Sequence, residues 1–278
     1  MQPSLSKNTK IVFVGGGKMG EAIFSGLISS KDSMAAQITA DMITVVAPTE
    51  SHREQLSERY GVSCVDDVSS VSAADIVVMA VKPQVIIGVM QQMQNLPAFK
   101  NTLVISIAVG LTTKTLGEIL PEQARLVRVM PNLPLVVGAG ASVVCGSASS
   151  SDAEVEWVCY LFNCLGQAYI IDEGDIDAAG AVSGSGPAYV CAMIEALTQA
   201  AINEGITAKL AEELVVQMLY GTAMQLKETK VSPAELREAV CSPKGTTLAA
   251  LAAMNEAGMQ EVYAKGVAAA IKRSKELS

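Results

Sequence analysis

Short apolar runs rich in β-branched residues alternate with helical spacing over roughly the first 170 residues. Runs of this kind are typical of parallel strands that are buried on both faces. The predicted strands are 11–15, 43–47, 75–81, 102–109, 125–131, 141–145 and 167–172, and helical patterns include 18–30, 50–60 and about 152–165. This alternation predicts the α/β class, with a doubly wound sheet.

The pattern becomes entirely helical after residue 172. Residues 187–204 are apolar on nearly every side, with Glu195 and Gln199 on the one polar stripe, so this helix is expected to be buried. An amphipathic helix follows at 208–228, and further helices are predicted at about 233–240, 246–256 and 258–276. We therefore divide the chain into an α/β domain at 1–172 and an all-α domain at 173–278.

Composition adds an expectation about assembly. The chain of 278 residues is 50% hydrophobic and 17% charged, below the roughly 25% charge of ordinary soluble domains. No run of about 18 apolar residues occurs, so no membrane span is expected. The surplus apolar surface predicts a subunit interface in the helical half, and hence an obligate homodimer.

Charge, cysteines and histidine exclude several classes of function. The net charge of −8 comes without any basic block, which argues against a nucleic-acid partner. Six cysteines lie singly in apolar runs, and too few apolar residues precede the first glycines for a signal-peptide core, so a reducing cytoplasm is expected. His52 is the only histidine, so neither metal catalysis nor a histidine-based triad is expected.

A glycine motif follows the first predicted strand and opens a helix. Gly15, Gly17 and Gly20 have G-x-G-x-x-G spacing, which in this context predicts a Rossmann-type dinucleotide site. Gly15 allows the tight turn, Gly17 lets the pyrophosphate approach the backbone, and Gly20 lets helix and strand pack closely. The phosphates then face the helix N-terminus.

The end of the second strand bears on the choice of cofactor. An NAD site usually has an acid there, whereas this chain has Ala47. Thr49, His52 and Arg53 follow, together with Ser51, and hydroxyls beside a guanidinium suit a 2′-phosphate. NADPH is therefore predicted, with weaker NADH use left open because Glu50 is also present. His52 and Arg53 are also compatible with a solvated first helical turn.

Five later stretches resemble, in their order, the pyrroline-5-carboxylate reductases over essentially the whole chain. They are AVKPQ (80–84), SIAVG (106–110), RVMPNLP (128–134), DAAGAVSGSGPAYV (177–190) and CSPKGTT (241–247). The resemblance implies NADPH-dependent reduction of L-1-pyrroline-5-carboxylate to L-proline. It also implies a Rossmann domain followed by a helical domain that forms an interlocked dimer, in some members within a larger ring such as a decamer.

The resemblance carries site residues over by position. The implied cofactor contacts, to which our own interpretation adds Arg53, are Gly15, Gly16, Gly17, Lys18, Met19, Gly20, Thr49, Ala80, Val81, Lys82, Pro83, Ile107, Ala108 and Val109. Glu173 falls where the family has an acid near the substrate, and Ser242, Gly245, Thr246 and Thr247 fall on its substrate loop. The chain departs from the family pattern at Lys244, where most members have glycine, and at Gly180, where the pattern has threonine.

The substrate loop is also interpreted from its own residues. Ser242 is expected as a helix N-cap with Pro243 at the first helical position, which leaves free N–H groups for a carboxylate. We expect Ser242, Gly245 and Thr246 to bind that carboxylate and the Thr247 hydroxyl, as the catalytic group, to contact the ring nitrogen. The alternative is a capped helix whose threonines face solvent.

Two other functions remain compatible with the pattern. A β-hydroxyacid-type dehydrogenase shares the Rossmann-plus-helices plan and requires a catalytic lysine, for which Lys209 and Lys227 are available on polar stripes. A non-catalytic NADP-sensing protein would keep the glycine motif and use the later stretches for packing alone.

Overall fold

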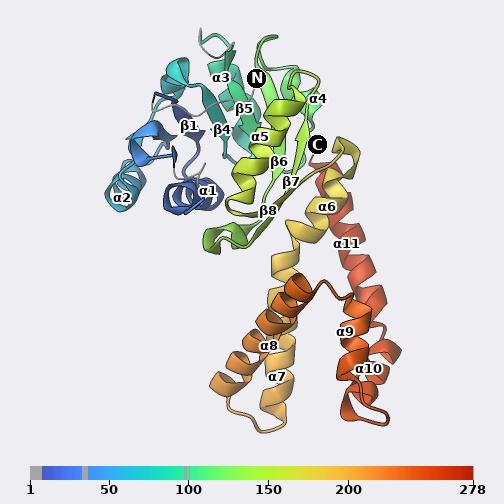
Figure 1. Cartoon of the computed structure of the whole chain (residues 1–278). Helices are drawn as coiled ribbons and strands as arrows, with labels where there is room; N and C mark the ends of the chain where they lie inside the picture. The colour runs from blue at the N-terminus through green and yellow to red at the C-terminus, as the bar shows by residue number, and fades with distance from the viewer. Residues whose placement is uncertain (1–7, 33–36, 97–98, 100, 278) are drawn as a thin grey trace. The chain divides into compact units, whose positions relative to one another are not determined.

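The structure is a computed structural model that describes residues 8–32, 37–96, 99 and 101–277 (Figure 1). Two compact units make up the chain: Met1–Ser185 with Ala270–Ser278, and Gly186–Ala269. The predicted boundary after residue 172 follows the change from strands to helices, whereas the units divide later. One reason is that Ile176, in the helix after that boundary, is buried against Val143 and Cys145 of the sheet.

An eight-stranded sheet organises the first unit. Its strands are β1 (Ile11–Val14), β2 (Ile43–Val46), β3 (Ser63–Val65), β4 (Ile76–Met79), β5 (Leu103–Ser106), β6 (Arg125–Met130), β7 (Gly140–Gly146) and β8 (Gly166–Ile170). The spatial order is β3-β2-β1-β4-β5-β6-β7-β8, and every neighbouring pair is parallel except β6 and β7. This order confirms the doubly wound α/β prediction, and β3 is the strand that the pattern did not predict.

Helices cover both faces of this sheet. They are α1 (Lys18–Ser29), α2 (Glu50–Tyr60), α3 (Pro83–Met93), α4 (Thr113–Gly117), α5 (Asp152–Asn163) and α6 (Ile176–Ser183), with 3₁₀ turns at Ala40–Met42, Val68–Ala73, Leu133–Val137 and Glu173–Asp175. Phe13 of β1 packs with α1 and α5, whereas Val12 and Val14 pack with α3 on the opposite face. Alternate residues of the strand therefore point to opposite faces of the sheet and contribute to two separate apolar layers.

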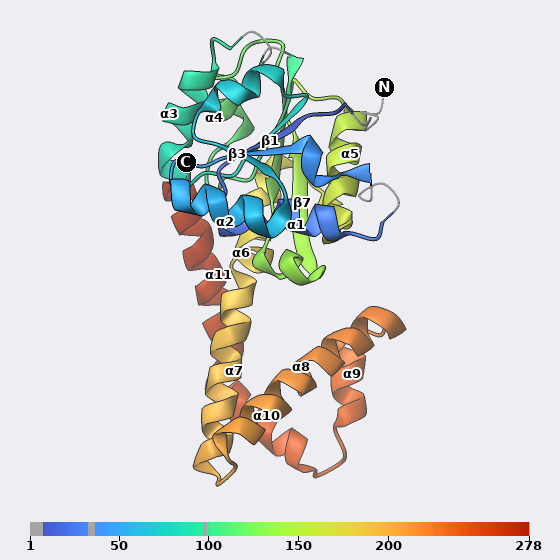
Figure 2. The same ribbon diagram turned by 90° about the vertical axis from the view of Figure 1, so that its left-hand side faces the viewer.

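The helices α1 and α2 lie side by side in the first unit (Figures 1 and 2). Glu21 of α1 accepts a hydrogen bond of 2.7 Å from the Tyr60 hydroxyl and pairs with Arg59 at 3.2 Å. The rings of Phe24 and Tyr60 meet edge to face, with their centroids 5.4 Å apart. The last turn of α2 is thus fixed to α1.

The regular secondary structure of the second unit is entirely helical. It contains α7 (Gly186–Asn203), α8 (Ala208–Thr229), α9 (Pro233–Val240), α10 (Thr246–Glu256) and most of α11 (Met259–Glu276). All five predicted helices are confirmed to within about one or two residues, which is the usual uncertainty of helix ends. None of the described helices combines the length and apolarity that a bilayer crossing requires.

The prediction that α7 is buried is wrong for the single chain. No residue of this fully described helix is buried, and Val190 is 44% exposed. On α8, Leu214 is 52% and Tyr220 60% exposed. The apolar pattern of α7 was correct, but one chain provides only α8 as a large packing partner within this unit, so much of the apolar surface stays uncovered.

Candidate functional site

The glycine loop after β1 has three glycines with three different surroundings. Gly15 has φ +111°, and a Cβ there would lie 2.6 Å from the Ala80 carbonyl oxygen. A Cβ on Gly20 would lie 2.5 Å from the Gly15 oxygen, so α1 packs directly on the turn. A Cβ on Gly17 would meet nothing within 4 Å. The chain therefore leaves open space at Gly17, as a ligand that approaches the backbone requires.

A cleft of about 560 Å³ opens at this position, within the size range of small-molecule sites. Three separate loops at the carboxyl ends of β1, β4 and β5 meet around it, as expected for an open α/β sheet. Its lining comprises Gly17, Lys18, Met19, Ala80, Val81, Lys82, Pro83, Ile107, Ala108, Val109, Met130, Pro131 and Gly184. Ten of the proposed cofactor residues thus share one cavity, while Gly15 and Gly20 shape the turn beneath it.

The end of β2 carries the residues proposed for the 2′-phosphate. Ala47 is buried there, and Thr49 is the α2 N-cap without a side-chain capping bond. Arg53 donates from Nη1 to the carbonyl oxygens of Ala47 and Pro48, each at 2.9 Å, and its Nη2 lies 3.9 Å from Asp66. The guanidinium is therefore held at the carboxyl end of β2, and its contact with a cofactor stays a prediction.

His52 is not a solvated helix residue. Its Nε2 lies 2.7 Å from the carbonyl oxygen of Gly16, so the first turn of α2 is joined to the glycine loop. The ring is half-buried. This contact spans 36 positions of sequence, and no local pattern indicated it.

Glu173 lies in a polar network with an arginine that sequence analysis did not assign. Its Oε1 accepts from the Thr113 backbone N–H at 2.5 Å, and its Oε2 accepts from the Thr113 hydroxyl at 2.6 Å. Arg128, whose side chain is 5% exposed, donates to Oε1 at 3.2 Å. Burial alone would raise the pKa of Glu173, but the bonds from Thr113 and Arg128 outweigh it and lower that pKa.

These bonds bear on the proposed role of Glu173. Both carboxylate oxygens already have partners, and Thr113 begins α4, three residues after the loop at Ile107–Gly110 that lines the cleft. A direct substrate contact by Glu173 stays a prediction. The signal that could have found Arg128 is a charged residue at the centre of a predicted strand with apolar residues on both sides, since a buried charge needs a partner.

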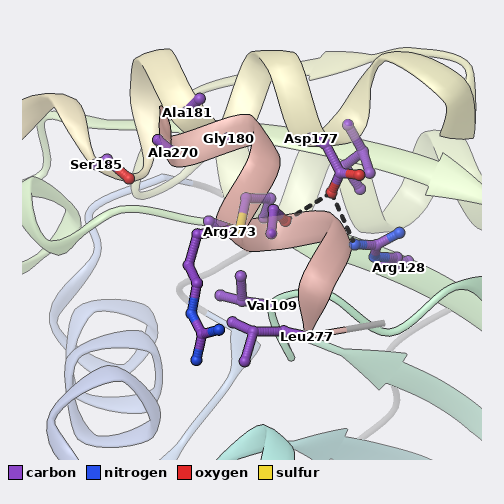
Figure 3. Close-up of a pocket in the computed structure, with 12 residues that line it drawn as sticks. Val109, Arg128, Asp177, Gly180, Ala181, Ser185, Ala270, Arg273 and Leu277 are labelled. Atoms are coloured by element: carbon purple, nitrogen blue, oxygen red, sulfur yellow. Dashed lines mark hydrogen bonds and ion pairs between the residues drawn. The ribbon is translucent and has the colours of Figure 1, made fainter. Parts of the chain in front are cut away.

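A second, smaller cavity of about 180 Å³ adjoins this network (Figure 3). Asp177 and Arg128 line it side by side, 4.0 Å apart, and the Ser274 hydroxyl donates to Asp177 at 2.8 Å. Leu277 packs against Gly110, because a Cβ added at Gly110 would lie 2.8 Å from the Leu277 Cβ. The end of α11 therefore holds the loop that leads from β5 to α4.

The N-cap predicted at Ser242 is wrong, whereas the predicted helix range 246–256 is correct. The helix α10 begins at Thr246 with Gly245 as N-cap, and residues 242–245 form a turn closed by a 2.9 Å bond from the Gly245 N–H to the Ser242 carbonyl. Pro243 occupies the second position of this turn and Lys244 the third, with φ +61°. Proline followed by positive φ defines a type II turn, so the Ser-Pro pair starts a turn rather than a helix.

This turn still delivers the expected groups to the helix start. A Cβ on Gly245 would overlap the Ser242 hydroxyl, so that hydroxyl lies directly over the N-cap. Thr246 and Thr247 are the first two helical residues, where backbone N–H groups have no partner within the helix. Thr247 is half-buried and Thr246 exposed. Carboxylate binding at this helix start stays a prediction, beside the alternative of a start that only faces solvent.

Known proteins match the chain over nearly its whole length. Residues 173–277 match the family model for pyrroline-5-carboxylate reductase dimerisation, and residues 10–110 match that for NADP oxidoreductases, coenzyme F420-dependent. A pyrroline-5-carboxylate reductase of Corynebacterium melassecola is 36% identical over 274 residues, covering 97% of this chain and 98% of that protein. The chain belongs to the pyrroline-5-carboxylate reductase family. The dimerisation match also indicates that the helical half takes part in oligomer formation.

Other pyrroline-5-carboxylate reductases agree over the same extent. The enzyme of Escherichia coli K12 is 34% identical, with 97% of this chain and 98% of that protein covered. The structure of the Coxiella burnetii reductase superposes with a TM-score of 0.88 at 34% identity, covering 98% and 99% of the two chains. That of Plasmodium falciparum pyrroline carboxylate reductase, with NADP bound, gives 0.86 at 28% identity with the same coverage.

Proposed function

We propose that this chain reduces L-1-pyrroline-5-carboxylate to L-proline with NADPH. The observation that carries the proposal is the open space over Gly17, in a cleft shared with the loops after β4 and β5. That geometry suits any dinucleotide-dependent enzyme. The choice of a cyclic imine as substrate rests on the named relatives, which align over nearly their whole length.

The residues of the first unit fit the dinucleotide. The α1 N-terminus, with Gly17 as N-cap, faces a pyrophosphate with free N–H groups, and Lys18 adds a positive charge at the same end of the helix. Ala80–Pro83 and Ile107–Val109 form the walls for the nicotinamide. When bound, the cofactor supplies the hydride. Because Ala47 leaves no acid at the end of β2 and Arg53 lies beside it, NADPH is the proposed cofactor and NADH the weaker one.

The turn and helix start in the second unit are proposed to bind the imine. The N–H groups at the start of α10 and the Ser242 hydroxyl bind its carboxylate, because a helix N-terminus favours negative charge. The Thr247 hydroxyl hydrogen-bonds the ring nitrogen and keeps it oriented while the carbon is reduced. Orientation of the imine and of the nicotinamide by the protein lowers the barrier to hydride transfer.

Glu173 is proposed to act on the site indirectly. Its carboxylate fixes Thr113 at the start of α4 and thereby the preceding loop with Ile107 and Val109. The bonds from Thr113, together with that from Arg128, lower the pKa of this carboxyl and keep it charged. The role of Glu173 is then to hold a wall of the cofactor cleft.

We further propose that the chain works as a homodimer. The exposed apolar side chains of α7 and α8, such as Val190 and Leu214, need a cover that the single chain lacks in its second unit. A partner of the same sequence provides a matching apolar face. A larger ring and a cytoplasmic location stay predictions.

The experiment is an NADPH oxidation assay with L-1-pyrroline-5-carboxylate against a panel of 3-hydroxyacids run with NADP⁺. Turnover of the imine alone supports the proposal. Turnover of hydroxyacids would favour the dehydrogenase alternative. The surroundings of Lys209 argue against that alternative, because its side chain is 87% exposed and pairs with Glu213 at 3.9 Å. Cofactor binding without any turnover would indicate an NADP-sensing protein.

A further inference from the structure

One side chain joins the glycine loop to a distant helix. His52 lies in the first turn of α2, and its Nε2 is 2.7 Å from the Gly16 carbonyl oxygen. A carbonyl oxygen can only accept, so Nε2 must carry the hydrogen. The ring therefore donates either as the neutral Nε2–H tautomer or as the imidazolium.

This bond sets the orientation of one peptide group in the cofactor cleft. A trans peptide is planar, so the Gly16 carbonyl and the Gly17 N–H point in opposite directions. By holding the carbonyl, His52 turns the Gly17 N–H away from α2. Two successive glycines give this peptide unusually wide conformational freedom, so an external bond has a large effect on its direction. Gly17 lines the cleft at the point where a Cβ would meet nothing.

The surroundings of Gly16 show that α2 braces the loop as a unit. A Cβ on Gly16 would lie 2.7 Å from Leu56 Cδ1, 3.0 Å from Val45 Cγ1 and 3.5 Å from His52 Nε2. Leu56 is four residues after His52, hence on the same face of the helix. Glu21 fixes the last turn of α2 to α1, and His52 fixes its first turn to the glycine loop. The helix is therefore held at both ends, and the His52 contact is the one that reaches the loop.

We infer that His52 is a positioning residue for the dinucleotide pyrophosphate rather than a reader of the 2′-phosphate. The hydrogen bond holds the Gly16–Gly17 peptide in the orientation that presents an N–H to the phosphates. The inference rests on the dinucleotide use in the proposed function and does not depend on which substrate is reduced. A pyrophosphate is common to NADPH and NADH, so loss of the anchor affects both cofactors alike.

The test is direct titration of the full-length protein with NADPH and with NADH, for wild type, His52→Leu, His52→Gln and His52→Asn. His52→Leu removes one net hydrogen bond and is expected to weaken both cofactors by the same factor, about 3- to 10-fold. The Gln amide nitrogen reaches about as far as Nε2 and restores binding. The shorter Asn amide, closer to the place of Nδ1, does not. At saturating NADPH, kcat and the KM for the imine stay at wild-type values.

Control variants and melting temperatures separate positioning from folding. Gln55→Leu introduces a leucine on the exposed side of α2 and is expected to leave both affinities unchanged. A loss confined to NADPH would overturn the inference and make His52 a 2′-phosphate ligand. Equal losses in the Gln and Asn variants, or losses that follow Tm, would reduce His52 to a packing residue.

The inference and the proposed function fail in different ways. If wild type binds both cofactors without reducing the imine, the proposed reaction is wrong and the His52 comparison stands. If wild type binds neither cofactor, both are overturned. Unchanged affinities in His52→Leu overturn the inference alone.

Discussion

Lys244 is expected to limit both the stability of the chain and the approach of its substrate. Among the described residues, Lys230 and Lys244 are the two non-glycine positions with positive φ, at 59° and 61°. The left-handed region costs an L-residue about 1–2 kcal/mol, and glycine loses about 0.5–1 kcal/mol more chain entropy on folding. Replacing either lysine by glycine should therefore stabilise the protein by about 0.5–1 kcal/mol, or about 1–3 °C in Tm.

The two positions differ in their surroundings, which makes Lys230 a matched control. Lys230 is the C-cap of α8, whereas Lys244 lies in the turn that leads into the start of α10. Lys230→Gly should raise Tm and leave the kinetics unchanged. Lys244→Gly should raise Tm equally but increase the KM for the imine about 2- to 5-fold, the effect of losing one exposed favourable charge. High salt should abolish that increase.

A third variant separates strain from charge. Lys244→Ala removes the ammonium but keeps a Cβ at positive φ, so it should share the KM increase of Lys244→Gly without its gain in Tm. Thermal unfolding and steady-state kinetics at low and high salt provide the readouts. A lower Tm for Lys244→Gly than for wild type would refute the strain argument. An unchanged KM in both variants would show that the lysine charge does not act on the proposed carboxylate site.

Three other substitutions test the assignments at the two loops and the buried network. Arg53→Ala should weaken NADPH about 10-fold or more and leave NADH nearly unchanged in titrations, because a charge-assisted contact contributes about 1.5–3 kcal/mol; equal losses would return Arg53 to a structural role. Thr247→Val should lower kcat/KM roughly 10²-fold with normal NADPH affinity, whereas Ser242→Ala should mainly raise the KM for the imine; normal turnover by Thr247→Val would exclude it as the proton-positioning group. The lowered pKa of Glu173 stabilises the fold above the ordinary carboxyl pKa, and this contribution is lost as pH falls through the folded value, so wild type should lose more Tm than Glu173→Gln between about pH 5 and pH 3; parallel Tm profiles would contradict this.

The fold was largely readable from periodicity, because its elements follow the two simplest patterns. Strands such as β1 and β4 are buried on both faces and appear as short continuous apolar runs. The exception is β3, an edge strand of three residues with no fully buried side chain. Its apolar run is too short for the periodicity to predict a strand. The helix α7 was predicted at the correct place but assigned the wrong surroundings, since an apolar pattern does not say which chain covers it.

The candidate site was readable where function depends on backbone geometry. The G-x-G-x-x-G spacing predicted the roles of Gly15, Gly17 and Gly20 because each role follows from the absence of a Cβ. The Ser-Pro pair misled because proline suits both the first position of a helix and the second position of a turn. The positive φ of Lys244 decides between them, and a lysine gives no sequence signal for that conformation.

The contacts that sequence analysis could not supply are those between elements distant in the chain, and they share one arrangement. His52 reaches Gly16 from α2, Glu173 reaches Thr113 from beyond β8, and Leu277 packs on Gly110 from the end of α11. In each case the group that is held is a backbone segment beside the cofactor cleft. Loops selected for close ligand approach have few side chains of their own to fix them, so neighbouring elements must provide the constraint. The cleft is lined mainly by glycine and apolar residues. Substitutions of these distant side chains should therefore alter cofactor binding without touching the cofactor.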